Sequence, residues 1–179
     1  EEESPEEETP SGVMDSVPDV SDEIVGNANV ALRGFVLANA LKENGTNLYL
    51  NDGKTDAVFD SGALEGDGSF FIDLGTAYTV TAVRLHAAAG MEGLLPTAYE
   101  VQLSQDGKNY TTVATEKQAS TADGILTVSF KAGAARYVRV VMTGVPTDAD
   151  GVRHYALAEA EVMANITAKN NIDLYQDHM

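Results

Sequence analysis

The sequence predicts an all-β protein, an antiparallel sandwich or barrel. Short runs with apolar residues at every second position recur along the chain, and they are rich in Val, Tyr, Phe and Thr. Turns rich in Gly, Asp and Asn separate these runs. A two-residue period is typical of strands with one buried face. Several such strands without a long helical pattern favour antiparallel sheets over mixed layers.

The first 25 residues differ from the rest in composition. Residues 1–23 contain ten acids and no Lys or Arg, and Pro and Ser interrupt them. Such a segment cannot bury enough apolar surface to offset its ordering entropy, so we interpret residues 1–25 as an acidic, extended linker. The globular domain is predicted over residues 26–164. Residues 165–179 would be a second linker or the start of a further module.

Individual strands follow from the alternating runs. The predicted strands are Ser69–Leu74, Val80–His86, Tyr99–Ser104, Ile125–Phe130, Arg136–Met142 and Ala158–Met163. The sequence Asp-Gly at 106–107 predicts a hairpin turn, because this pair tolerates the positive φ that tight turns need. The same pair at 123–124 predicts a second turn.

Composition excludes several functional classes. The net charge of −17 disfavours a nucleic-acid partner. No apolar run approaches the ~20 residues of a membrane span. The chain contains no cysteine, which excludes a disulfide, a thiolate metal site and a cysteine nucleophile. No recognised catalytic motif occurs and the three histidines are scattered, so we expect a protein that is not an enzyme.

The order of the motifs resembles a known family. The motifs are NVAL at 29–32, LNDGKTDAVF at 50–59, FIDLG at 71–75, VTAVRLH at 80–86, ARYVRVVMTG at 135–144 and YALAEAEVM at 155–163. This series resembles the coagulation factor V/VIII type C, or discoidin, domain, and it is nearest to the bacterial family 32 carbohydrate-binding modules. The resemblance implies an eight-stranded jelly-roll sandwich, galactose-binding-like, with a ligand site in the loops at one end.

The resemblance also implies a structural calcium ion. The family's calcium loop aligns with residues 52–59, so Asp52, Asp56 and Ala57 are the expected loop ligands, and Glu159 of the last strand completes them. Lys54 and Ala57 depart from the family pattern. Calcium takes six to eight oxygen ligands, which include backbone carbonyls. The alternative is that Asp52 caps a turn and Glu159 is a solvated strand residue.

A sugar site on such a domain needs an aromatic ring and a few polar groups. The family places an aromatic residue in the loop before the last strand. Here Tyr155 or His154 stands at that position, with Arg153 beside it, so these three are the main candidate ligand-binding residues. The alternative is that Tyr155 packs into the end of the sandwich and Arg153 only balances charge.

Three further polar residues complete the candidate ligand site. Glu65 and Asp67 follow the calcium loop, where galactose-binding relatives place hydrogen-bonding residues. His86 ends a strand and could face the same loops. Each has an alternative interpretation as a solvated or structural residue. Residues 87–95 lack the arginine and asparagine of galactose-binding relatives and are apolar instead, which favours a protein or surface partner.

Together these features predict a non-catalytic carbohydrate-binding module. We expect a galactose-type or related glycan as the partner, and a calcium ion as cofactor. The module would belong to a larger, multimodular bacterial protein that is secreted or held at the cell surface. The alternative is a protein- or cell-surface-adhesion module of the same fold without a sugar ligand.

Overall fold

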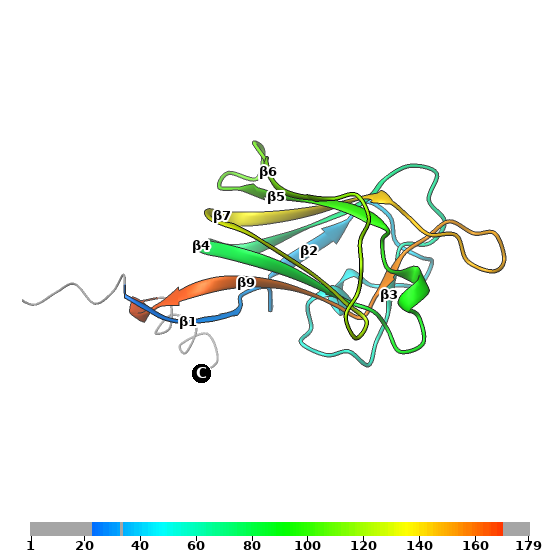
Figure 1. The fold of residues 1–179 in the computed structure, drawn as a ribbon, viewed down its shortest axis with the longest axis horizontal. Coiled ribbons are helices and arrows are strands. Elements are labelled where there is room, and N and C mark those ends of the chain that lie inside the picture. The colour runs from blue at the N-terminus through cyan, green and yellow to red at the C-terminus, as the bar shows by residue number, and fades with distance from the viewer. Residues whose placement is uncertain (1–22, 33, 170–179) are drawn as a thin grey trace, which may run out of the picture. The chain divides into compact units, whose positions relative to one another are not determined.

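A computed structural model describes residues 23–32 and 34–169, and Figure 1 shows their fold. These residues form nine strands and two short 3-10 turns. In chain order they are β1 (Ile24–Asn29), β2 (Phe35–Ala38), η2 (Asn47–Leu50), β3 (Phe59–Asp60), β4 (Gly68–His86), η3 (Glu92–Leu94), β5 (Ala98–Ser104), β6 (Thr111–Glu116), β7 (Ile125–Gly144), β8 (Ala156–Leu157) and β9 (Glu159–Thr167). Every strand pair given a register is antiparallel, so the predicted all-β, antiparallel class is confirmed.

The chain divides into two compact units. Residues 27–165 form one unit, and the described terminal residues 23–26 and 166–169 belong to the other. In the described part of the terminal unit, the N–H of Ala168 donates a hydrogen bond to the carbonyl of Glu23 at 3.1 Å. Most of the predicted linkers, residues 1–22 and 170–179, lie outside the described residues.

Two long strands, β4 and β7, organise the larger unit (Figure 1). The first part of β4 pairs with β2 and with the second part of β7, whereas the second part of β4 pairs with β9 and with the first part of β7. The register shifts between Asp73 and Tyr78, and Gly75 adopts a φ of 84° there. Both long strands belong to one seven-stranded sheet, in which β2 pairs with β4, and β3 and β8 form a second, two-stranded sheet.

This continuity corrects part of the sequence prediction. Two pairs of predicted strands, 69–74 with 80–86 and 125–130 with 136–142, are each one bent strand. The small residues between them form irregularities in the ladder rather than turns, because both flanks keep their pairing with the same neighbour. Alternation itself is confirmed: Tyr99, Val101 and Leu103 of β5 are all buried.

The predicted hairpin joins β5 to β6. Asp106 accepts hydrogen bonds from the backbone N–H groups of Lys108 and Asn109, both at 2.8 Å, and Gly107 has a φ of 76°. The turn before β7 is also present, with Asp123 and Gly124 at φ 55° and 74°. Within the described residues, no helix has the length and apolar character needed to cross a membrane.

Candidate functional site

The short sheet of β3 and β8 fixes the loops that form the candidate site. Phe59 pairs with Leu157 and Asp60 with Ala156. The contact continues past the strands, because the N–H of Ser61 donates to the carbonyl of Tyr155 at 3.0 Å. Further out, the N–H of residue 64 donates to the carbonyl of residue 153 at 2.8 Å. Residues 59–64 therefore run beside residues 153–157, although about 90 residues separate them in the sequence.

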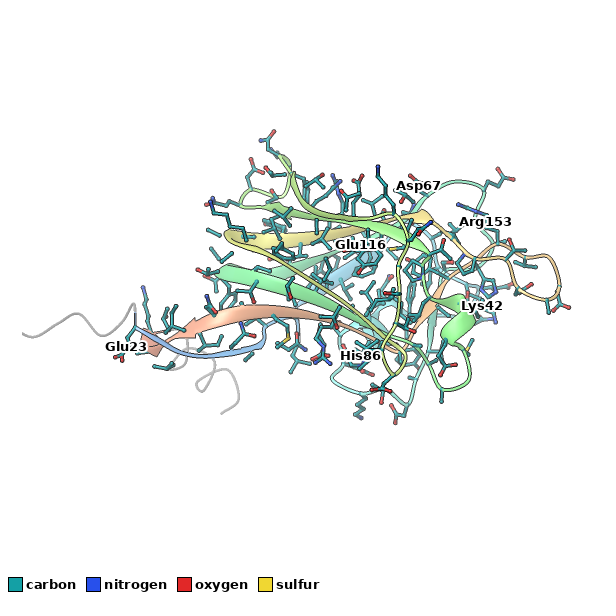
Figure 2. All side chains as sticks on the ribbon, viewed as in Figure 1. Glu23, Lys42, Asp67, His86, Glu116 and Arg153 are labelled. Carbon is teal, nitrogen blue, oxygen red and sulfur yellow. The ribbon has the colours of Figure 1, made fainter. Side chains whose placement is uncertain are left out.

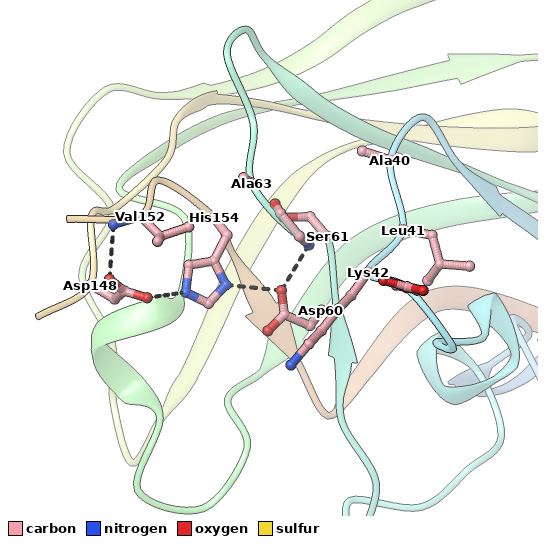
Figure 3. Close-up of a pocket in the computed structure, with 11 residues that line it drawn as sticks. Ala40, Leu41, Lys42, Asp60, Ser61, Ala63, Asp148, Val152 and His154 are labelled. Carbon is pink, nitrogen blue, oxygen red and sulfur yellow. Dashed lines mark hydrogen bonds and ion pairs between the residues drawn. The ribbon is translucent and has the colours of Figure 1, made fainter. Parts of the chain in front are cut away.

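A cavity of about 620 Å³ opens beside this contact (Figure 3). Three segments line it: the loop after β2, the segment from β3 onward, and the loop before β8. The lining residues are Ala40, Leu41, Lys42, Glu43, Asp60, Ser61, Gly62, Ala63, Asp148, Val152 and His154. Apolar and polar surface therefore meet in one concave site, as ligand pockets require.

His154 forms the most constrained polar contact in the cavity. Its Nδ1 lies 2.9 Å from Oδ1 of Asp60, and its Nε2 lies 2.9 Å from Oδ2 of Asp148 (Figure 3). A neutral imidazole has only one N–H, so both contacts are hydrogen bonds only when the ring is an imidazolium. Burial lowers the pKa of His154, but the two carboxylates outweigh burial and the net direction is upward. The geometry therefore fits an imidazolium that bridges two acids.

Asp148 closes its own loop as well as holding His154. Its Oδ1 accepts the N–H groups of Asp150 and Val152, both at 2.9 Å. These bonds to backbone N–H, the one from Val152 first, lower the pKa of Asp148, and the bond from His154 adds to them. Gly151 has a φ of 80°, a conformation that glycine adopts without strain. One charged side chain therefore fixes the rim of the cavity at residues 148–152.

Tyr155 cannot be the exposed ring on which a sugar stacks, which corrects the prediction. Its side chain is 0% exposed, and its ring lies 5.7 Å from that of Phe59 between centroids. A Cβ at Gly68 would come within 2.5 Å of the Tyr155 ring, so this glycine makes room for it. Burial raises the pKa of Tyr155, and its hydroxyl has no partner among the described residues. The alternative stated for Tyr155, packing into the end of the sandwich, is the one that the structure has.

Arg153 lies next to the cavity but holds a loop. Its Nη1 donates to the carbonyls of Leu64 at 3.3 Å and Gly66 at 2.5 Å. Glu65 and Asp67 belong to the same loop, are exposed, and do not line the cavity. Figure 2 labels Asp67 and Arg153. Of the predicted ligand-binding residues, the structure places His154 alone in the cavity wall.

His86 does not line this cavity. Its Nε2 contacts Oε1 of Glu161 on the neighbouring strand β9, and Arg84 lies 3.5 Å from the same oxygen. The ring is therefore held against the face of the β4–β9 pair and not against the cavity lining. The apolar loop 87–95 is more covered than predicted, because Leu95 is buried and Leu94 half-buried.

At the predicted calcium ligands, the structure has a buried carboxylate rather than an open cavity. Glu159 is only 3% exposed, and neither carboxylate oxygen has a hydrogen-bond partner among the described residues. Burial raises the pKa of Glu159 to about 8, and the nearby charge of Asp52 contributes in the same direction. The backbone N–H groups of Gly53 and Lys54 lower this pKa, but they do not form full hydrogen bonds with the carboxylate. Asp56 is exposed and Ala57 half-buried. No group of three or more His, Cys, Asp or Glu side chains with an arrangement that could hold a metal ion occurs in the part of the chain that the structure describes.

Sequence reasoning missed most of the cavity. The roles of Asp60 and Asp148 were not predicted, and neither were those of Lys42 and Glu43. Asp60 directly follows the aromatic position of the calcium loop, and Asp148 begins the loop that contains His154. Asp148 lies six residues before His154, and this short spacing could have indicated their ion pair. The ion pair of His154 with Asp60 depends on the contact between β3 and β8, which the sequence does not show.

Comparisons with known proteins agree with this fold. Two solved structures from Paenibacillus sp. IK-5 match: chitosan-binding module 1 of a chitosanase/glucanase, studied as a selenomethionine-labelled mutant, and module 2 in complex with chitotriose. Each is 27% identical to this chain with a TM-score of 0.65. The match to module 1 covers 78% of this chain and 100% of that module, and the match to module 2 covers 75% of this chain and 98% of that module. The family 32 module of NanJ from C. perfringens, in complex with galactose, is 16% identical with a TM-score of 0.63, over 77% of this chain and 99% of its own, and shows the fold alone.

The fold and these matches define the class as a galactose-binding-like β-sandwich domain. The family model described as NedA-like, galactose-binding domain, one of the F5/F8 type C models, matches residues 49–140. The chain therefore belongs to this family, which confirms the resemblance to discoidin domains near the family 32 modules. No curated protein matches the sequence significantly.

Proposed function

We propose that the domain is a non-catalytic module that binds a glycan in the cavity beside His154. The observation that carries this proposal is the meeting of fixed polar groups with apolar side chains in one open cavity of about 620 Å³. Leu41 and Val152 offer apolar surface to the face of a sugar ring. Asp60, Ser61 and Lys42 offer acceptors and donors to its hydroxyl groups.

The state of His154 supports binding rather than catalysis. Both ring nitrogens are engaged with carboxylates, so the ring has no free position from which to accept a proton from a substrate. The names of the matching structures point the same way, because they describe chitosan-binding modules and a family 32 module bound to galactose. We infer a binding role that serves another part of a larger protein.

An open cavity of this kind gives low individual affinity, because little area is buried. A module of low affinity is useful when it is linked to others or to an enzyme, since linkage raises the effective concentration at the glycan. We therefore place the domain in a multimodular bacterial protein that acts outside the cell or at its surface, where such glycans are found. The acidic segment 1–25 would be its spacer.

A calcium ion is the second part of the proposal. Glu159 is buried without a partner and lies near the charge of Asp52, so a cation between the loop and β9 would remove both penalties. Asp52 and Glu159 would supply carboxylate oxygens, and residues of the loop such as Ala57 would supply carbonyls. When bound, the ion would supply structural charge neutralisation that fixes loop 52–57 to the last strand.

An adhesion module of the same fold is the second candidate function. Phe35 is 61% and Leu37 45% exposed on β2, and the ring of Phe71 lies 6.0 Å from that of Phe35. Exposed apolar side chains that gather on one sheet favour a protein or surface partner. A partner that binds there would leave the His154 cavity open.

A glycan array with two variants separates these functions. Ala40→Arg places a long side chain in the cavity, and Ala132→Arg makes the same change at an exposed position of β7. We expect sugars to bind the unmodified protein and the Ala132→Arg variant, and binding to fall at least about tenfold in Ala40→Arg, as about 1.4 kcal/mol would give. If no glycan binds and the protein is instead retained on cells through Phe35 and Leu37, adhesion becomes the favoured function.

A further inference from the structure

The cavity contains more acid than base. Among the residues that line it, Glu43, Asp60 and Asp148 are carboxylates, and Lys42 and His154 are the cationic groups. The charge of His154 is already used, because each of its nitrogens faces one of the two aspartates. One negative charge therefore remains in excess at the site, on a protein whose isoelectric point is about 4.3.

One of the two carboxylate oxygens of Asp60 is available to a ligand. Its Oδ1 accepts two hydrogen bonds, from the N–H of Gly62 at 2.8 Å and from Nδ1 of His154 at 2.9 Å. Its Oδ2 accepts no hydrogen bond from the described residues, although the side chain is only 14% exposed and lines the cavity. A half-engaged carboxylate that is held in place by two donors is a rigid acceptor for a ligand group.

Among the described residues that line the cavity, none is aromatic. Its apolar lining consists of Ala40, Leu41, Ala63 and Val152, and the nearest predicted platform, Tyr155, is fully buried. Stacking of a sugar on a ring therefore contributes nothing in this cavity. Affinity must come from hydrogen bonds, of which those to a charged group are roughly twice as strong as neutral ones.

We propose that the cavity selects a hexosamine residue with a free ammonium group, which donates to Oδ2 of Asp60. This inference rests on the proposed glycan-binding function and names its substrate class. A sugar carboxylate would be repelled by Asp60 and Asp148, and an N-acetyl group would lose the charge that the acceptor favours. The anionic chain also attracts a polymer of amino sugars from a distance.

Calorimetric titration with three short ligands tests the inference. The ligands are the glucosamine trisaccharide chitotriose, its fully N-acetylated counterpart, and trilysine, which carries ammonium charge without a sugar ring. We expect chitotriose to bind about tenfold more tightly than the N-acetylated sugar, with affinity that falls as NaCl rises. Trilysine should bind no better than the N-acetylated sugar, which separates selection in the cavity from attraction to the acidic chain as a whole.

Two variants locate the effect. Asp60→Asn keeps the shape of the acceptor but removes its charge, and it should abolish the preference for chitotriose. Glu116→Gln on β6 removes the same charge outside the cavity and should keep the preference (Figure 2). The comparison among ligands uses the unmodified protein, so it remains decisive even if Asp60→Asn does not fold.

The outcomes distinguish the two levels of the proposal. Equal or tighter binding of the N-acetylated sugar overturns the inference about the ammonium and leaves the glycan-binding function standing. Equal binding of trilysine overturns it as well. Absence of binding to both sugars, together with an empty glycan array, contradicts the proposed function itself.

Discussion

The segment from Asp52 to Asp60 contacts the last part of the domain, residues 148–159, at two places. The two places differ in how their acidic side chains are neutralised. At one place Asp60 faces Asp148, and His154 lies between them with a nitrogen 2.9 Å from each. At the other place Asp52 lies near Glu159, and the described residues supply no cation and no full hydrogen bond to the Glu159 oxygens, although the backbone N–H groups of Gly53 and Lys54 lower its pKa. The chain thus neutralises one pair of acids itself and leaves the other pair unneutralised.

The difference shows how a small domain uses its charges. A built-in imidazolium gives a fixed wall for a ligand cavity, whereas an unpartnered buried carboxylate costs free energy unless an ion is bound. The first arrangement is suited to recognition, and the second to a structural metal. The predictions below test whether the two places behave as differently as their geometry indicates.

The largest expected effect is calcium dependence at Glu159. At free calcium about 100 times the Kd, binding adds about 2.7 kcal/mol to the free energy of unfolding, which raises Tm by roughly 5–10 °C. Scanning calorimetry with calcium or with a chelator measures this shift. Glu159→Gln should abolish the shift, while Glu161→Gln on the same strand should retain it. A chelator that leaves the Tm of the unmodified protein unchanged would remove the ion from the account.

The next effect concerns the cation that the chain supplies. His154→Gln replaces the two ring nitrogens that bridge Asp60 and Asp148 with a single amide group, so we expect a loss of about 1–3 kcal/mol in stability. Glycan affinity should fall at least about tenfold, because the cavity wall loses its fixed geometry. His86→Gln, which changes a histidine paired with Glu161 outside the cavity, should leave glycan affinity unchanged. An equal loss of glycan affinity in both variants, measured by a binding titration, would contradict the different roles given to the two histidines.

A smaller effect is the pH dependence of the calcium-free protein. The pKa of Glu159 is raised from 4.5 to about 8, so its stabilising contribution is complete below pH 4.5 and is lost as pH rises toward 8. The pKa of His154 is also raised, and its contribution is lost in the same direction, above pH 6.5. In chelator, Tm should therefore fall by a few degrees between pH 5 and pH 8. Saturating calcium should flatten this slope, and a Tm that rises with pH in chelator would contradict it.

The smallest expected effect is that of Tyr155→Phe. The hydroxyl of Tyr155 is buried without a partner in the described residues, so its removal relieves a penalty and loses no hydrogen bond. Stability should stay within about 0.5 kcal/mol or rise slightly, and glycan affinity should not change. A large loss of affinity would restore Tyr155 as a ligand-binding residue.

The sequence predicted the class of fold because alternation is a local property. Tyr99, Val101 and Leu103 are buried as their spacing indicates, and Asp106 and Gly107 form the expected hairpin turn. The joining of 69–74 with 80–86 into one strand was not predictable locally, since small residues between two strands are compatible with either a turn or a bulge.

The candidate site was less accessible to sequence reasoning. His154 was identified, but its two acids lie six and 94 residues away, and only the pairing of β3 with β8 brings Asp60 to it. For Tyr155 the sequence leaves both a ligand-binding ring and a core ring open, because a tyrosine in a loop is compatible with either side. The glycine at 68, which makes room for the ring, lies on a distant strand and carries no signal in the sequence.

The most direct test of the central claim is an NMR titration of the ¹⁵N-labelled protein with chitotriose. We expect the largest shifts at the backbone amides of Lys42, Ser61, Gly62 and Val152, which line the cavity from all three segments. Shifts confined to β2 around Phe35 and Leu37, with these four amides unchanged, would contradict the account.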